Sequence, residues 1–172
     1  AQHQSETLRT FTLPPDLVGS VQATVQREPA PATQSKLPVI ERIRSTGRLR
    51  VGYAPQVIPF SYFNASGELV GYDIAFVYAL ARALNVDLEL VPFADWSRLD
   101  DDLEAGHFDL AVGGIFLTTE RLRDTTVSRS YRESPPALIA STETAGRMLD
   151  GKALREDETL RIAGFSSDLM ES

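Results

Sequence analysis

The sequence contains no cysteine and only two histidines, His3 and His107, among its 172 residues. The absence of cysteine excludes disulfides, thiol nucleophiles and cysteine-ligated metal sites, although it leaves the redox compartment open. The two histidines are too few and too far apart in the sequence to predict a zinc site. There is no glycine-rich phosphate motif and no nucleophile elbow. We therefore expect no metal and no cofactor.

Positive charge is also scarce, because the 17 basic residues are scattered among 24 acidic ones and the net charge is −7. A nucleic-acid surface needs clustered Lys and Arg, so the composition argues against nucleic-acid binding. No apolar run approaches the roughly 20 residues that cross a bilayer. The acidic run Asp100–Asp102 predicts a solvated helix face rather than a metal site, since consecutive helical residues point in different directions.

Residues 1–37 differ in composition from the rest of the chain. The stretch Glu28–Thr33 (EPAPAT) is typical of an extended linker. Apolar residues before it have the spacing of a short amphipathic helix: Leu13, Leu17, Val18, Val21 and Val25. We interpret residues 1–37 as an N-terminal arm or linker, and a tether, a docking arm and plain disorder all remain open. The first residues lack the basic and apolar regions of a signal peptide.

After this arm, local signals become regular. A short helix is expected over residues 38–44, with a proline in its first turn and a stop at Gly47. Leu49–Tyr53 then has the pattern of a strand. A hairpin is expected over residues 60–70, because the loop Asn64–Gly67 separates two apolar runs and ends in glycine.

A longer helix is expected to begin at Asp73, a suitable N-cap, and to end at Asn85. A strand over residues 86–91, a helix from Asp95 to about Ala105 and a strand over residues 109–112 follow. Helices that alternate with short strands indicate βαβ units. The sequence therefore predicts an α/β fold with a mainly parallel sheet flanked by helices.

Local signals weaken after Tyr131. Two short strands are expected at residues 137–140 and 160–163, with a helix over residues 143–149 between them. We expect a first α/β lobe over residues 38–133 and the crossover and beginning of a second lobe over residues 134–172.

Four motifs occur in register along the chain: Arg48–Gly52 followed by Pro59-Phe60, then Gly67–Ile74, Leu103–Asp109 and Gly113–Arg121, the last followed by Ser130-Tyr131. Together they resemble the type 2 periplasmic solute-binding proteins, and most of all the polar-amino-acid group of ABC uptake systems. The resemblance covers roughly residues 37–142. It implies two α/β lobes that close on a small solute outside the cytoplasm. The implied partners are a membrane permease or a fused transporter or sensor unit.

The second lobe of that fold has no complete counterpart before Ser172. We therefore expect a fragment, a truncated form or a degenerate relative. An incomplete second lobe predicts weak solute binding and self-association of the chain.

The resemblance implies a ligand site of seven residues: Tyr53, Trp96, Gly113, Gly114, Phe116, Thr118 and Arg121. Arg121 falls where the family clamps the carboxylate of its ligand, a role that suits a planar, permanently charged, bidentate donor. The alternative is a surface arginine paired with Glu120 or Asp124. Gly113 and Gly114 follow a strand at its carboxyl end, where backbone N–H groups bind anions, although a tight turn needs the same residues.

The remaining site residues each keep a second interpretation. Thr118 either donates its hydroxyl to a solute or caps the following helix, while Trp96 and Tyr53 either line the pocket or pack in the core. Phe116 stands where the family has Ser or Thr. Ala54 and Val57 replace the acid and the aromatic that hold an amino-acid ligand. We therefore expect a carboxylate-bearing solute that need not be a standard α-amino acid.

The sequence thus predicts a non-catalytic, extracytoplasmic or periplasmic module that binds a small carboxylate for transport or sensing. An enzyme of the same fold, such as a dehydratase or a peptidoglycan lyase, is one alternative. It would need a general acid or base, and Glu68, Asp73 and Asp95 are the candidates, each with a simpler role in a turn or cap. A non-binding sensory or structural module of a larger membrane protein is the other alternative.

Overall fold

The computed structural model describes residues 6–33, 35–93, 95–119, 121–133, 139–142, 145–146 and 161. The chain divides into two compact units, residues 1–116 and 117–172. This division lies before residue 133, where the sequence predicts the end of the first lobe. The strands expected at residues 137–140 and 160–163 and the helix expected at residues 143–149 lie largely outside the described residues.

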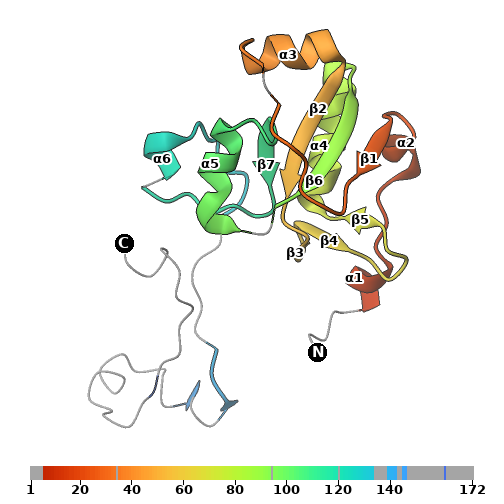
Figure 1. Cartoon of the computed structure of the whole chain (residues 1–172). Coiled ribbons are helices and arrows are strands. Elements are labelled where there is room, and N and C mark those ends of the chain that lie inside the picture. The colour runs from red at the N-terminus through yellow and green to blue at the C-terminus, as the bar shows by residue number, and fades with distance from the viewer. Residues whose placement is uncertain are drawn as a thin grey trace. The chain divides into compact units, whose positions relative to one another are not determined.

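The first unit is built on a four-stranded parallel sheet (Figure 1). Its strands are β1 (Ala23–Val25), β6 (Asp87–Pro92), β2 (Arg48–Tyr53) and β7 (Leu110–Val112), in that spatial order. A smaller antiparallel sheet contains β3 (Gln56–Val57), β4 (Ser61–Phe63) and β5 (Leu69–Val70), and the β4–β5 pair is the expected hairpin. The α/β class with a parallel sheet is thereby confirmed.

The helices that flank the sheet begin and end close to where the sequence predicts. Helix α3 (Val39–Thr46) ends at Gly47, and helix α4 (Tyr72–Leu84) ends at Asn85, both in the left-handed conformation that such stops require. A 3-10 turn, η1 (Trp96–Arg98), and helix α5 (Leu99–Glu104) connect β6 to β7. In the described part of the chain, no helix is long and apolar enough to cross a membrane.

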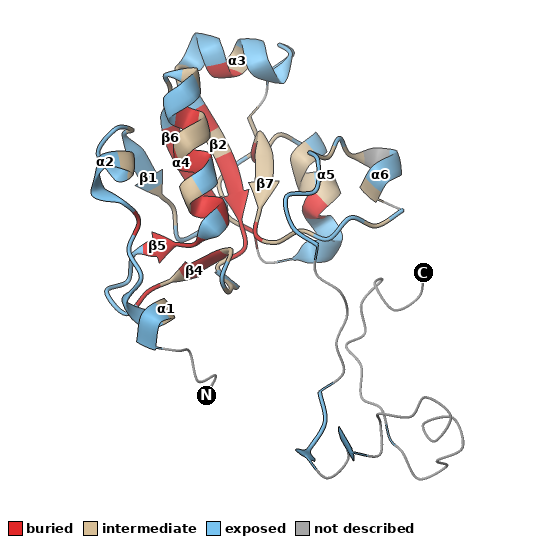
Figure 2. Cartoon of the chain, turned by 180° about the vertical axis from the view of Figure 1, so that it is seen from behind, coloured by how far each residue is buried: buried red, intermediate tan, exposed pale blue. Residues whose placement is uncertain are grey.

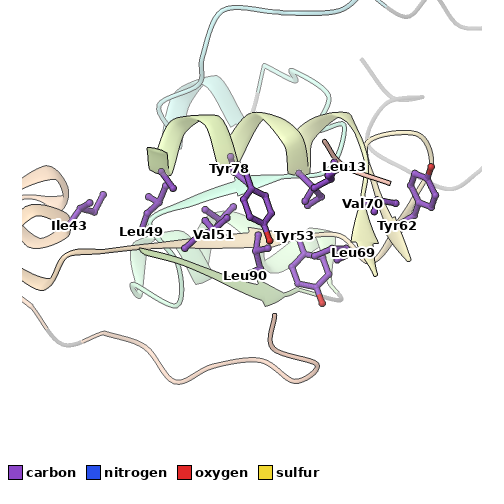
Figure 3. Close-up of a cluster of buried hydrophobic side chains, with 14 residues drawn as sticks. Leu13, Ile43, Leu49, Val51, Tyr53, Tyr62, Leu69, Val70, Tyr78 and Leu90 are labelled. Carbon is purple, nitrogen blue, oxygen red and sulfur yellow. The ribbon is translucent and has the colours of Figure 1, made fainter. Parts of the chain in front are cut away.

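Helix α4 covers one face of the sheet and forms the main core with it (Figures 2 and 3). Leu49 and Val51 of β2 lie opposite Leu88 and Leu90 of β6 in the register of the two strands. Alternate residues of a strand share a face, so all four side chains point to the same side. The helix contributes the apolar residues spaced along its inner surface: Ile74, Val77, Tyr78 and Ala81.

The opposite face of β2 and β6 combines an ion pair with an aromatic cluster. Arg50 and Glu89 are register partners, and the Nε of Arg50 lies 3.0 Å from the Oε2 of Glu89. Gly52 faces the ring of Phe108, which a Cβ at position 52 would approach to 2.8 Å. Phe108 belongs to a second buried cluster with Ala54, Phe93 and Leu99.

The N-terminal arm packs against the sheet of the first unit, as a docking arm would, which is one of the interpretations that the sequence leaves open. It contains α1 (Glu6–Thr10) and α2 (Pro15–Val18), and its strand β1 pairs with the edge of β6. The expected amphipathic helix is therefore limited to α2, since the residues around Val25 form a strand instead.

The proline-rich stretch of the arm is held on the sheet through its backbone. The Nη1 of Arg50 donates to the carbonyl of Pro31 at 2.9 Å, and the Nδ1 of His107 lies 2.8 Å from the carbonyl oxygen of Ala30. The amide of Thr33 donates to the carbonyl of Gly106 at 2.8 Å. These contacts fix the stretch that composition alone assigns to a free linker.

The earlier part of the arm is anchored in the same way. The hydroxyl of Tyr62 donates to the carbonyl of Leu8 at 3.1 Å, and the Nδ2 of Asn64 donates to the carbonyl of Phe11 at 2.9 Å. Leu13 belongs to the main core and is 7% exposed. The arm therefore contributes buried apolar surface as well as hydrogen bonds.

An integral arm predicts that Leu13→Ala destabilises the chain by about 2–4 kcal/mol, because it removes a buried side chain from the core. Leu37→Ala is the matched control, since Leu37 is the last residue of the arm and is 50% exposed. Urea unfolding followed by circular dichroism measures both free energies of unfolding. Equal and small losses in the two variants would show that the arm is a tether after all.

Candidate functional site

The carboxyl ends of three parallel strands meet at one edge of the main sheet. Ala54 follows β2, Phe93 follows β6 and Gly113 follows β7. The amide of Ala54 donates to the carbonyl of Val112 at 3.3 Å, and the amide of Phe93 donates to the carbonyl of Tyr53 at 3.1 Å. Open α/β sheets place their ligands outside the carboxyl ends of their strands. This edge is therefore the candidate site of the first unit.

Gly113 and Gly114 form a turn that has no room for side chains. Gly113 has a φ angle of 136°, and a Cβ at this position would lie 2.8 Å from the Cβ of Ala54. Gly114 has a φ angle of 66°, and a Cβ there would lie 2.6 Å from the ring of Phe60. Both amides donate to the Oδ2 of Asp73, at 2.9 Å and 2.8 Å. The sequence predicts that these N–H groups bind a solute anion, whereas in the structure the protein's own carboxylate accepts from both.

Asp73 does not cap helix α4, which corrects the role expected from the sequence. The N-cap position is Gly71, and Asp73 lies in the first turn of α4 with 3% exposure. The amides of Tyr72 and Asp73 donate to the carbonyls of Pro59 and Phe60, each at 3.0 Å. Backbone carbonyls from a preceding loop thus satisfy the first donors of the helix, and the Asp73 side chain reaches across to β7.

Three of the sequence motifs therefore meet at one place. We call this place the junction and define it by Pro59-Phe60, Gly71–Asp73 and Gly113-Gly114. Gly71 is required there, because its φ is 134° and a Cβ would lie 2.1 Å from the carbonyl oxygen of Phe60. The motifs are far apart in the sequence, but each one contributes backbone groups or a carboxylate to the same set of hydrogen bonds.

Trp96 is the first residue of the turn η1 that follows β6, and it lies on the surface of the aromatic cluster. Its ring packs edge-to-face on Phe93, with centroids 5.0 Å apart and an angle of 88° between the ring planes, and the side chain is 39% exposed. Asp95 caps the turn, because its Oδ1 accepts from the amide and the hydroxyl of Ser97. These bonds lower the pKa of Asp95, so the cap stays charged over a wide pH range. Trp96 is thus held in place while part of its ring remains exposed.

Tyr53 and Phe116 have opposite environments. Tyr53 is 1% exposed in the main core, and its hydroxyl donates to the carbonyl of Gln26 at 2.9 Å. Burial raises the pKa of this phenol. Of the two roles left open for Tyr53, core packing is the one that the structure displays. Phe116, the last residue of the first unit, is largely exposed.

Thr118 and Arg121 belong to the second unit and are described within it. The hydroxyl oxygen of Thr118 accepts from the amide of Arg121 at 3.2 Å, and its carbonyl accepts from the amide of Leu122 at 3.1 Å. Thr118 therefore caps the short helix α6 (Arg121–Asp124), one of the two roles expected for it. The side chain of Arg121 is half-buried.

The three candidates for a general acid or base have structural partners. Asp73 holds the junction, Asp95 caps η1, and the Oε2 of Glu68 accepts from the Nδ2 of Asn64 at 2.8 Å within the hairpin loop. Among the residues that the structure describes, no group of three or more His, Cys, Asp or Glu side chains is arranged to hold a metal. Asp102 of the acidic run forms an ion pair with Arg98, which precedes it by four residues, and its Oδ1 lies 3.6 Å from the Nη2 of Arg98.

Comparisons with known proteins identify relatives of both functional kinds. The profile of the bacterial extracellular solute-binding proteins, family 3, matches residues 49–163. Cyclohexadienyl dehydratase of Pseudomonas aeruginosa is 32% identical over 113 residues, which cover 64% of this chain and 42% of the relative. Membrane-bound lytic murein transglycosylase F of an Enterobacter species is 29% identical over 109 residues, 63% of this chain and 20% of the relative.

A third relative is a transport protein. The glutamate/aspartate import solute-binding protein of Escherichia coli K12 is 26% identical over 148 residues, which cover 82% of this chain and 47% of the relative. The chain thus spans less than half the length of each of these three curated relatives.

The junction predicts that Gly114→Ala is more destabilising than Gly47→Ala. The two glycines have nearly equal φ angles, 66° and 64°, so both substitutions carry the same backbone strain of about 1–2 kcal/mol. A Cβ at position 47 meets nothing within 4 Å, whereas one at position 114 meets the ring of Phe60. Overpacking should add roughly 1–3 kcal/mol at position 114, measured by urea unfolding. Equal losses would mean that the turn is not packed as described.

Proposed function

Since the chain belongs to the bacterial extracellular solute-binding proteins of family 3, we propose that it binds a small carboxylate-bearing solute and performs no chemistry on it. The solute is an amino acid or a related organic acid, and binding serves transport or sensing outside the cytoplasm. The partner is a membrane permease or a fused transporter or sensor unit. The relatives of this chain include enzymes as well as binding proteins.

The exposed ring of Trp96 supports the proposal more than any other observation. Leaving a large aromatic side chain in water is unfavourable in free energy. Trp96 is nevertheless held partly exposed at the carboxyl edge of the sheet by its contact with Phe93 and by the Asp95 cap. An aromatic surface held rigid in this way provides a wall for the apolar part of a small solute. The match to a solute-binding family supports a small solute as the ligand that contacts this aromatic surface.

Arg121 supplies the charge that a carboxylate needs. The planar guanidinium of an arginine offers paired donors that fit the two oxygens of a carboxylate. The cap that Thr118 provides fixes the backbone from which Arg121 projects. We therefore assign the solute carboxylate to Arg121.

The residues around Ala54 bear on the nature of the solute. Ala54 is buried against the Gly113 turn and carries no charge, and Gly113 and Gly114 already donate to Asp73. The Ala54 side chain and the Gly113 and Gly114 amides are therefore not suited to hold an ammonium or a second carboxylate of the solute. A solute that lacks the α-amino group is thus as suitable as an amino acid.

The charge of Arg121 predicts that Arg121→Lys weakens solute binding roughly tenfold or more, because a bidentate charged contact is lost. Arg123→Lys is the matched control, since Arg123 lies on the same helix and is exposed. Calorimetric titration with L-arginine, L-glutamate, L-cystine and succinate identifies the best ligand and compares the variants. An unchanged affinity in Arg121→Lys would refute the assignment, and no binding by any of the four would contradict the proposed function.

The exposure of Trp96 predicts a fluorescence change when the same compounds bind. Trp96 is the sole tryptophan of the sequence, so emission reports on this position alone. Contact with a solute should shift the emission to shorter wavelength and reduce quenching by acrylamide. Saturating ligand that leaves both signals unchanged would assign Trp96 to packing only.

A further inference from the structure

The Gly113-Gly114 turn has the geometry of an anion site, and the anion is already part of the chain. Two consecutive glycines with positive φ direct their amides to one point, and the Oδ2 of Asp73 occupies that point. A carboxylate that accepts two N–H bonds while 3% exposed is held by charge-assisted hydrogen bonds in a place of low water access.

The Asp73 carboxylate is fixed from its own side as well. The first turn of α4 is tied to Pro59 and Phe60 through the amides of Tyr72 and Asp73. Gly71 lies so close to Phe60 that no side chain fits between them. These contacts fix the first turn of α4, and the hydrogen bonds of Asp73 tie the turn after β7 to it.

The turn leads directly to the end of the first unit. Ile115 packs on the cluster that contains Phe93 and Ala54, and Phe116 is exposed immediately after it. The position of the Gly113-Gly114 backbone thus sets where these residues emerge from the sheet edge.

From these contacts we propose that Asp73 is a positioning residue whose carboxylate serves as an internal ligand of the Gly113-Gly114 amides, and that removing it opens a site for a small external carboxylate. The inference does not depend on the proposed function, because it concerns a site that is filled from within. It assigns a role to Asp73 that a capping residue would not have.

Chemical rescue by formate tests this role. Asp73→Ala removes only the carboxylate group beyond Cβ, and formate has the same two oxygens on one carbon. We expect Asp73→Ala to lower the melting temperature of the chain by roughly 5–10 °C. Sodium formate should restore part of this loss, in proportion to the logarithm of its concentration, while sodium chloride at the same ionic strength should not.

Two further variants provide the controls. Leu13→Ala is destabilised at a site without a carboxylate, so formate should not restore it. Asp73→Asn keeps an oxygen that accepts from both amides, so it should fold, melt between wild type and Asp73→Ala, and gain nothing from formate. If Asp73→Ala does not fold in chloride, recovery of its circular dichroism spectrum in formate is the expected result.

Equal formate effects on Asp73→Ala and Leu13→Ala would overturn the proposal, since they would reflect a general salt effect. An Asp73→Ala variant that melts with the wild type would overturn it as well. So would an Asp73→Asn variant that gains as much from formate as Asp73→Ala does.

Discussion

The hydrogen bonds between the Asp73 carboxylate and the Gly113-Gly114 amides are the constraint on which the rest of the sheet edge depends. A buried carboxylate is costly unless donors surround it, and two converging backbone amides supply them. That convergence needs positive φ at both positions and no side chain against Ala54 or Phe60. Helix α4 must also begin where its first two amides can donate to the Pro59 and Phe60 carbonyls. The hydrogen bonds of the junction thus explain why three motifs that are far apart in the sequence need the residues they have.

Much of the fold could be predicted because its signals are local. Gly47 and Asn85 end their helices by adopting left-handed conformations, and the loop before Glu68 closes a hairpin as expected. The N-terminal arm could not be predicted in this way. Its proline-rich stretch is held through the carbonyls of Ala30 and Pro31, and every residue type carries a carbonyl. Composition therefore indicates a linker, whereas in the structure strand β1 pairs with β6 and the proline-rich stretch is hydrogen-bonded to the sheet.

The sequence predicts which residue types form the candidate site better than it predicts their hydrogen-bond partners. Glycines after a strand indicate a turn whose amides can bind an anion, but the sequence does not reveal that the acceptor is the carboxylate of Asp73. Asp at a helix start resembles an N-cap, and only the position of Gly71 as the true N-cap separates the two roles. Periodicity likewise could not distinguish the buried Tyr53 from the exposed Trp96, because each follows or ends a strand of the same sheet.

Amide hydrogen exchange of the wild-type chain, followed residue by residue by NMR, tests the junction most directly. Loop amides that donate only to water exchange rapidly, whereas amides that open only with the whole sheet exchange at the rate of global unfolding. Because both glycine amides donate to a buried carboxylate, we expect Gly113 and Gly114 to exchange as slowly as the central strand β2. Exchange of the two glycines at the rate of an exposed loop, with β2 still protected, would contradict the account.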